Sequence, residues 1–220
     1  MTQTGDMSSG STVRAQAVSK VLGPTALLAP TDLTADPGTC AVVRGVNGSG
    51  KTTLLRLIAG LWEPTSGQVT IDDRVADERD PVLRSQVATL IGAPAAYRDL
   101  TLTDHLTLID ATWGRDPDTC AQRVADQLAD LEIDHLGERF PHELSSGQGQ
   151  LFRLSLVLFR PGSLIILDEP EQRLDTDKRV LIGDLLAERR DAGVTLVVAC
   201  HDPDLTERIA DGIHTLAAAE

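Results

Sequence analysis

Two kinds of apolar pattern alternate along this chain. Short, mostly apolar runs predict strands at 40–43, 68–72, 86–91, 163–167 and 194–200. The last two runs are nearly continuous, as expected of parallel strands that are covered on both faces. Scattered apolar positions over 13–33 suit strands at a sheet edge. Because helical segments lie between these runs, the pattern predicts an α/β fold with a mostly parallel sheet.

Apolar residues at helical spacing predict the segments between the strands. One helix begins at Lys51 and ends near Gly60, and another covers 176–190. Between 103 and 158 the pattern is helical in three stretches, with a break at 114–117. We therefore expect a helical subdomain at about 93–150, inserted into an α/β core made of about 12–92 and 155–217. Residues 1–11 are small and polar, and we expect them to form a disordered tail.

Composition narrows the functional classes. The chain has 220 residues and a formal net charge of −13, which argues against DNA or RNA as a main partner because phosphate backbones require clustered Lys and Arg. There is no run of about 18 apolar residues to predict a membrane span, and the N-terminus lacks a signal peptide's pattern. Cys40, Cys120 and Cys200 are widely spaced, so we expect ordinary thiols in a reducing compartment.

A glycine-rich segment with the pattern G-x-x-x-x-G-K-T follows the strand predicted at 40–43. It reads Gly45-Val46-Asn47-Gly48-Ser49-Gly50-Lys51-Thr52 and leads into the helix that begins at Lys51. Glycines allow successive N–H groups to converge on a phosphate, and a helix N-terminus adds positive potential there. Lys51 would reach the outer phosphates of a nucleotide, and the Thr52 hydroxyl would ligate magnesium. An ordinary glycine-rich turn is the alternative, but the Lys-Thr pair and the flanking elements favour a nucleoside triphosphate site.

Three further features could belong to the same site. Two of them follow predicted strands, whose carboxyl ends would lie beside that loop, and the third lies at the start of a helix. Asp168 and Glu169 end the strand predicted at 163–167, where Asp168 would hold magnesium and Glu169 would act on the attacking water. Leu144-Ser145-Ser146-Gly147-Gln148 precedes a helix and could bind an anion. His201 ends the run 194–200. Each has a plainer interpretation taken alone: a strand entering a polar loop, a helix N-cap, and a structural histidine.

The order of these motifs along the chain and the intervals between them favour the functional interpretation of all of them. From about Val13 to Leu216 the chain resembles the nucleotide-binding subunit of ATP-binding cassette (ABC) transporters. Its loop Gly45–Thr53 matches the Walker A motif of that family, and 165–169 is similar to Walker B with the catalytic glutamate. Leu144–Gln148 resembles the signature L-S-G-G-Q, with Ser146 for the first glycine. The D-loop position is held by 172–175, and the switch-histidine position by His201.

The resemblance implies a P-loop NTPase core with an antiparallel edge β-subdomain and an inserted helical subdomain. It implies ATP and Mg²⁺ as cofactors and a head-to-tail pair of such domains with ATP at their interface. The implied nucleotide-binding residues are Gly45, Val46, Asn47, Gly48, Ser49, Gly50, Lys51, Thr52, Thr53, Ser145, Gly147 and Gln148. The implied catalytic residues are Lys51, Glu169 and His201, and the implied metal ligands are Thr52 and Asp168. In such a pair, Ser145 and Gly147 of one copy would face the phosphate loop of the other.

By the same resemblance, membrane subunits would convert the ATP cycle into transport, with the chain on the cytoplasmic face of the cell membrane. We expect the partner to dock near Ala95-Ala96-Tyr97. The short length and compact C-terminus look like export-type subunits. A nucleotide-gated regulatory module with little turnover and an ATPase of a soluble assembly remain alternatives.

Two departures from the family pattern bear on turnover. The family carries an aromatic residue that stacks on adenine, and the corresponding stretch, Val21-Leu22-Gly23, has none. We therefore expect weaker base selectivity. The family also has a glutamine after the strand at 86–91, where this chain reads Gly92-Ala93-Pro94, and Gln86 lies too early to replace it. We expect slower or less tightly coupled hydrolysis as a result.

Overall fold

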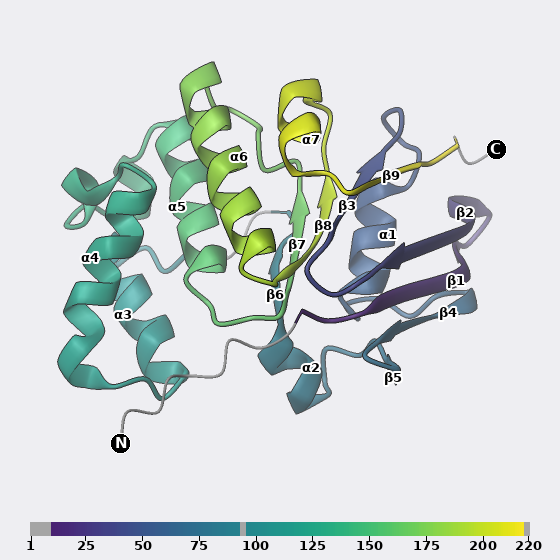
Figure 1. The fold of residues 1–220 in the computed structure, drawn as a ribbon, viewed down its shortest axis with the longest axis horizontal. Coiled ribbons are helices and arrows are strands. Elements are labelled where there is room, and N and C mark those ends of the chain that lie inside the picture. Colours follow the sequence, from purple (N-terminus) through teal and green to yellow (C-terminus); the bar gives the residue numbers. More distant parts are fainter. Residues whose placement is uncertain (1–9, 93–95, 218–220) are drawn as a thin grey trace.

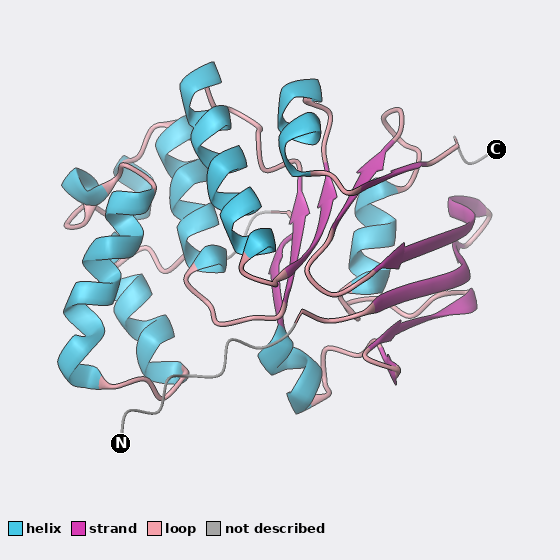
Figure 2. Cartoon of the chain, in the orientation of Figure 1, coloured by secondary structure: helices cyan, strands magenta, loops and turns pink. Residues whose placement is uncertain are grey.

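The fold consists of two sheets and a group of helices, with the helices α3 and α4 at one end and the antiparallel strands at the other (Figure 1). The computed structural model describes residues 10–92 and 96–217. A five-stranded sheet of order β6-β7-β8-β3-β9 lies between these two ends (Figures 1 and 2). This arrangement confirms the α/β fold with a mostly parallel sheet and an antiparallel edge subdomain.

All neighbouring strands of the five-stranded sheet are parallel. Its strands are β6 (Val87–Leu90), β7 (Leu164–Asp168), β8 (Thr195–Ala199), β3 (Cys40–Arg44) and β9 (Gly212–Thr215). Successive residues of the central strands enter different hydrophobic clusters: Ile165 and Leu167 pack on one face of the sheet, and Leu164 and Ile166 on the other. Burial on both faces explains why these strands are continuous apolar runs in the sequence.

Helices cover both faces of this sheet. Helix α1 (Lys51–Ile58) packs on one face together with the antiparallel strands. Helices α6 (Thr176–Asp191) and α7 (Pro203–Ile209) contribute to the cluster on the other face. Because α1 directly follows β3, its N-terminus lies at the carboxyl edge of the sheet, which is where phosphate sites form.

The antiparallel sheet has the order β2-β1-β4-β5. Its strands are β1 (Val13–Leu22), β2 (Thr25–Ala35), β4 (Ser66–Ile71) and β5 (Arg74–Val75). Val13, Val18 and Leu33 of this sheet are almost fully buried against the α1 side of the molecule. The scattered apolar positions of 13–33 are therefore the inward face of a sheet that is exposed on its other side.

The inserted helical part comprises α3 (Leu102–Thr112), α4 (Cys120–Asp130) and α5 (Ser146–Leu158), with short 3₁₀ turns between them. Thr101 and Ser145 begin α3 and α5 with capping boxes, in which the side chains of the N-cap and third residues exchange hydrogen bonds with the backbone. The sequence pattern located these helices well. The division of the chain at 93 and 150 stays a prediction, since residues 93–95 lie outside the described part of the chain.

Several short elements differ from the sequence expectations. The segment from Gln86 was expected to be a strand, but Gln86 ends helix α2 (Pro81–Gln86), and β6 starts one residue later. Helix α7 and strands β5 and β9 were not predicted. Both α2 and α7 begin with an Asp N-cap followed by Pro, so a start signal was present although the helices are too short for a clear apolar period.

The expected tail is corrected at its last two residues. Residues 1–9 lie outside the described part of the chain, but Gly10 and Ser11 are buried. The Ser11 hydroxyl is 2.7 Å from the hydroxyl of Ser163, which precedes β7. A Cβ at Gly10 would lie 2.3 Å from the Gly193 carbonyl oxygen, so the chain packs there closely enough to require glycine. A polar, small-residue composition predicted disorder because sequence alone cannot show this packing.

Candidate active site

The predicted phosphate loop lies between β3 and α1 at the carboxyl edge of the parallel sheet. Gly50 has φ of 94°, and a Cβ there would lie 2.6 Å from the Leu27 carbonyl oxygen. A Cβ at Gly45 would lie 2.4 Å from the Ser49 hydroxyl oxygen. Gly50 is therefore required by backbone conformation and by close approach to backbone, whereas the nearest atom at Gly45 belongs to the Ser49 side chain. The strand, turn and helix that the motif needs are all present.

Lys51 is the buried cation of this loop. Its side chain folds back over the loop, so that Nζ donates to the carbonyl oxygens of Gly45 at 2.9 Å and Val46 at 3.3 Å. The residue is 6% exposed, and Ser49 is 1% exposed with a hydroxyl that has no hydrogen-bond partner among the described residues. An orphaned donor beside a buried ammonium group is suited to an anionic ligand, whose oxygens would satisfy both.

Thr52 and Asp168 connect the loop to β7. The Thr52 hydroxyl donates a 2.7 Å hydrogen bond to Asp168 Oδ2, and the other carboxylate oxygen, Oδ1, is buried without a partner among the described residues. A hydroxyl and a carboxylate are the hard oxygen ligands that Mg²⁺ prefers, usually with water completing the shell. The two residues, with an unsatisfied buried oxygen between the loop and the strand, therefore fit a magnesium site.

Glu169 follows directly and has an unusual backbone conformation. Its φ is 51°, in the left-handed region, and its N–H donates to the Ala199 carbonyl oxygen at 2.8 Å. A non-glycine residue held at positive φ is strained by about 1–3 kcal/mol, and such strain concentrates at functional sites. The conformation directs the carboxylate toward the end of β8, where His201 Nε2 lies 3.2 Å from Oε1. The Gln172 side-chain amide donates to Oε2.

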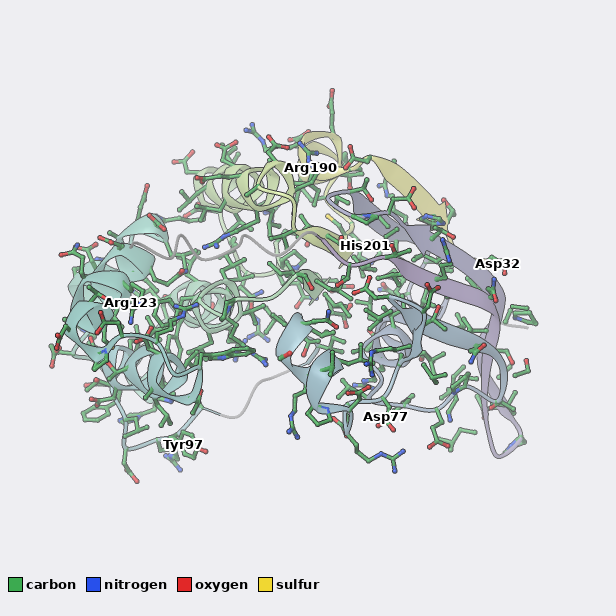
Figure 3. All side chains as sticks on the ribbon, turned by 60° about the horizontal axis from the view of Figure 1, so that its bottom comes forward. Asp32, Asp77, Tyr97, Arg123, Arg190 and His201 are labelled. Atoms are coloured by element: carbon green, nitrogen blue, oxygen red, sulfur yellow. The ribbon has the colours of Figure 1, made fainter. Side chains whose placement is uncertain are left out.

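His201 lies near the middle of the molecule, between the helical part that carries Arg123 and the antiparallel sheet that carries Asp32 (Figure 3). Its side chain is 44% exposed, so it is open to a ligand or to a second protein chain. The structure thus brings together Lys51, Thr52, Asp168, Glu169 and His201 from the ends of β3, β7 and β8. Sequence reasoning did not identify Gln172 as a contact of Glu169 or Glu171 as a contact of the His201 backbone.

A polar cavity of about 390 Å³ lies beside this cluster, where the family glutamine would be expected. Its lining includes Thr52, Asp168 and Glu169 from the cluster and Gly92 after β6. Arg153 of α5 also lines it, and no sequence signal pointed to this residue. Ala93 and Pro94 of the predicted departure lie outside the described residues. Gln86 is at the opposite edge of the sheet, where its amide contacts Asp72 at 3.4 Å, so it does not substitute for the missing glutamine.

The predicted signature residues lie apart from the phosphate loop. Ser145 is the exposed N-cap of α5 and accepts a hydrogen bond from the Gln148 N–H at 3.3 Å. A Cβ at Gly147 would meet the Arg173 carbonyl oxygen at 3.1 Å, which places Gly147 beside the loop at 172–175. Ser146 is the first residue of α5 and does not have a positive φ, so the backbone there does not require the glycine of the family signature. An exposed helix start of this kind is accessible to a second chain.

Comparison with known proteins defines the class. The fold matches solved ATP-binding cassettes, among them a dimeric post-hydrolysis state bound to ADP and Pi, with a TM-score of 0.84, 24% identity and coverage of 94% of each chain. A family model described as ABC transporter matches residues 28–172. The chain therefore belongs to the ABC transporter family.

Particular relatives are similar over most of this chain. A sulfate/thiosulfate import ATP-binding protein of Caulobacter vibrioides is 33% identical over 210 residues, which cover 93% of this chain and 62% of that protein. An Fe(3+) ions import ATP-binding protein of Mesorhizobium japonicum is 35% identical over 188 residues, which cover 83% of this chain and 51% of that protein. The chain thus spans about half to three-fifths of the length of these relatives. Within the described residues, every helix is too short or too polar to cross a membrane.

Proposed function

We propose that this chain binds ATP and hydrolyses it as the motor subunit of an ABC transporter. The observation that carries the proposal is the convergence of a phosphate loop, a threonine–aspartate pair and a glutamate–histidine pair at one edge of the sheet. The names of the relatives, which are ATP-binding proteins of transporters, support the same function. ATP would lie along the loop 45–53, with its outer phosphates at Lys51 and the N-terminus of α1.

Glu169 and His201 would act at the terminal phosphate. Glu169 would accept a proton from the attacking water, which requires its carboxylate to exchange its contacts with His201 and Gln172 for a contact with that water. His201 would then donate a hydrogen bond to a phosphate oxygen as negative charge builds up. Lys51 would leave the loop carbonyl oxygens and neutralise the outer phosphates. These residues thus stabilise charge and orient water, which is what phosphoryl transfer mainly requires.

Magnesium would be held by Thr52 and Asp168. When bound, it neutralises charge on the outer phosphates and links them to the protein. The orphaned Oδ1 of Asp168 and the adjacent hydroxyl support this assignment. The Thr52–Asp168 hydrogen bond occupies one oxygen of that site and would open or rearrange on loading.

A second nucleotide-binding domain would complete the site. The exposed Ser145 with Gly147 and Gln148 at the N-terminus of α5 would reach the terminal phosphate held by the other copy. A dimeric cassette among the structural neighbours supports this arrangement. ATP would therefore hold the pair together, and hydrolysis would open it.

Transmembrane subunits would be the other partners, with this chain peripheral on the cytoplasmic face of the membrane. Tyr97, at the edge of the helical part in Figure 3, is 64% exposed while its N–H donates to His105 Nε2 at 2.9 Å. An exposed aromatic ring on a fixed backbone suits such a contact, although Ala95 of the predicted docking segment lies outside the described residues. The expected lean toward export has no support, because several relatives are named as import proteins, for sulfate/thiosulfate, spermidine/putrescine, Fe(3+) ions and glucose.

A module with little turnover is the second candidate. The observation that favours it is Gly92, which lines the cavity beside Thr52 and Asp168 without a side chain that could contact magnesium or water.

An assay of magnesium-dependent phosphate release by the purified chain separates the two functions. For a motor, Glu169→Gln should keep ATP affinity and lower turnover by roughly 10²–10⁴-fold. Lys51→Ala should lose ATP affinity, whereas the control Arg189→Ala, near the end of α6, should change neither affinity nor turnover.

Turnover near background in both wild type and Glu169→Gln, with ATP affinity intact, would establish the regulatory module instead. Absence of ATP affinity in the wild type would contradict both candidates.

Transport is tested separately, by isolating the tagged chain from membranes and identifying what accompanies it. A multi-span membrane protein supports the transporter, and a wholly water-extractable complex contradicts it. Tyr97→Ala should then uncouple transport without changing nucleotide affinity.

A further inference from the structure

Glu171 is a buried acidic residue two positions after Glu169, in the loop that joins β7 to α6. It is 6% exposed. Its Oε1 accepts hydrogen bonds from the backbone N–H groups of His201 at 2.8 Å and Asp202 at 3.3 Å. The Cys200 thiol donates to the same oxygen at 3.4 Å. One carboxylate oxygen therefore holds three successive residues at the end of β8.

The position of this contact follows from where the sheet stops. The registered pairing of β7 with β8 ends at Asp168 and Ala199, and the Glu169 N–H adds one further bond to Ala199. Among the described residues no backbone hydrogen bond joins these two segments beyond that point, so the N–H groups of His201 and Asp202 need another acceptor. Glu171 supplies it. Its side chain thus extends the link between the two segments past the last backbone bond.

Burying the negative charge of Glu171 has a free-energy cost that a neutral residue would avoid. The second carboxylate oxygen, Oε2, is buried and has no hydrogen-bond partner among the described residues. A buried, incompletely satisfied carboxylate is unfavourable unless its remaining contacts compensate. Burial is the main cause that raises the pKa of Cys200 to about 12, and the negative charge of Glu171 is the second. The thiol therefore stays protonated and acts as a donor. The contacts of Oε1 are therefore what the residue contributes.

The position of His201 depends more on these backbone hydrogen bonds than the position of a buried residue would. Its imidazole is 44% exposed, so little side-chain packing holds it, and its position depends on the backbone that carries it and on its 3.2 Å contact with Glu169. Asp202 strengthens the same segment, since its carboxylate accepts from the Leu205 N–H at 2.9 Å and pairs with Arg179 of α6 at 2.9 Å. The backbone after β8 is thus fixed from α6, from α7 and from Glu171.

We propose that Glu171 is a positioning residue for ATP hydrolysis, which holds the His201 backbone so that the imidazole, beside Glu169, reaches the terminal phosphate. This inference rests on the proposed ATPase function. It is distinct from the role of Glu169, because Glu171 contacts the main chain of the histidine and not the water or the phosphate. Loss of its acceptor should therefore affect the rate of the chemical step and spare the binding of ATP.

Steady-state ATPase kinetics on the full chain test the proposal. Glu171→Met has a similar length and no equivalent acceptor, and it should lower kcat roughly ten- to hundredfold with little change in KM for ATP. Glu171→Gln keeps an acceptor oxygen and should recover most of that loss. In a His201→Ala background, Glu171→Met should cause no further loss of kcat, because the two residues act as a unit. Glu188→Met, at an exposed position on α6, is the matched control and should leave kcat unchanged.

Other outcomes separate this inference from the function on which it rests. Equal losses of kcat in the wild-type and His201→Ala backgrounds would overturn it, as would an unchanged kcat in Glu171→Met. Absence of turnover in the wild type would overturn the proposed function itself. Urea unfolding of each variant shows whether the fold is retained. Glu171→Ser, with a smaller side chain, repeats the double-mutant cycle if methionine prevents folding, and the same two results then decide it.

Discussion

The Thr52 hydroxyl and the Asp168 carboxylate, 116 positions apart in the sequence, form a 2.7 Å hydrogen bond between the phosphate loop and β7. This bond links the two halves of the α/β core on either side of the inserted helices. It also places a hydroxyl and an orphaned carboxylate oxygen together at the position expected for magnesium.

Thr52→Val removes the hydroxyl while keeping the shape of the side chain. Because one ligand is lost and Asp168 loses its donor, we expect the magnesium-dependent gain in ATP affinity to fall roughly ten- to hundredfold. Titration calorimetry with and without Mg²⁺ measures this gain. Thr52→Ser keeps the hydroxyl and should retain most of it. Equal gains in the valine variant and the wild type would remove Thr52 from the metal site.

Gly50→Ala tests the backbone requirement of the phosphate loop. Both Gly50 and Gly193 have positive φ, but a Cβ at Gly193 would have no atom within 4 Å, whereas one at Gly50 would meet the Leu27 carbonyl oxygen at 2.6 Å. Left-handed backbone alone costs about 1–2 kcal/mol. Gly193→Ala should therefore lower the free energy of unfolding by about that amount and leave ATP binding intact. Gly50→Ala should cost more and abolish ATP binding, as urea unfolding and calorimetry would show.

Leu22→Tyr tests the missing contact to adenine. Leu22 is 64% exposed at the end of β1 and offers no ring for stacking, so we expect the wild type to bind ATP and GTP with similar affinity. An aromatic ring there should raise ATP affinity by up to about tenfold, since stacking contributes about 0.5–1.5 kcal/mol. Val75→Tyr on β5, at a position 57% exposed, is the control for an added surface ring. Equal effects of the two substitutions would place the base elsewhere.

Asp110 supports the helical part through a buried carboxylate. Its side chain is 2% exposed and accepts hydrogen bonds from Arg123 Nε at 2.9 Å and Arg115 at 3.4 Å. The hydrogen bond from Arg123 holds the pKa of this carboxyl below its usual value. Asp110→Asn should lower the free energy of unfolding at pH 7 by about 3 kcal/mol, because it leaves two partly buried guanidinium groups without their counter-charge.

The pH dependence of this contribution follows from the lowered pKa of Asp110. A carboxyl whose folded pKa lies below its unfolded value of about 3.9 contributes fully above that pH and loses its contribution as pH falls through the folded pKa. The difference between wild type and Asp110→Asn should thus persist from pH 7 to about pH 4 and shrink below it. Asp184→Asn, at a side chain 59% exposed and paired with Arg208, should change stability by less than about 1 kcal/mol. A difference that grows in acid would contradict this account.

Much of the fold could be predicted because its signals are local or periodic. The strands β7 and β8 were clear, since parallel strands buried on both faces must be apolar throughout. Helix α5 was clear from its apolar positions Leu151, Leu154 and Leu158, and helix α6 from the turn residues 191–193 that end it. Short elements were missed for the opposite reason: β5 has two residues and α7 seven, and neither length establishes a period. Gln86 was assigned to the wrong element because a helix end and a strand start meet at that residue.

By itself, the sequence determined which residue types stand at the ends of which strands, and therefore the phosphate loop, the two carboxylates after β7 and the histidine after β8. A chemical group can be assigned from sequence when its neighbours in the chain are also its neighbours in space. Tertiary structure alone decided the contacts between distant segments: Thr52 with Asp168, and Glu171 with the backbone of His201. Those pairings depend on the order of strands in the sheet and on where its ladder ends, which are properties of the packed chain.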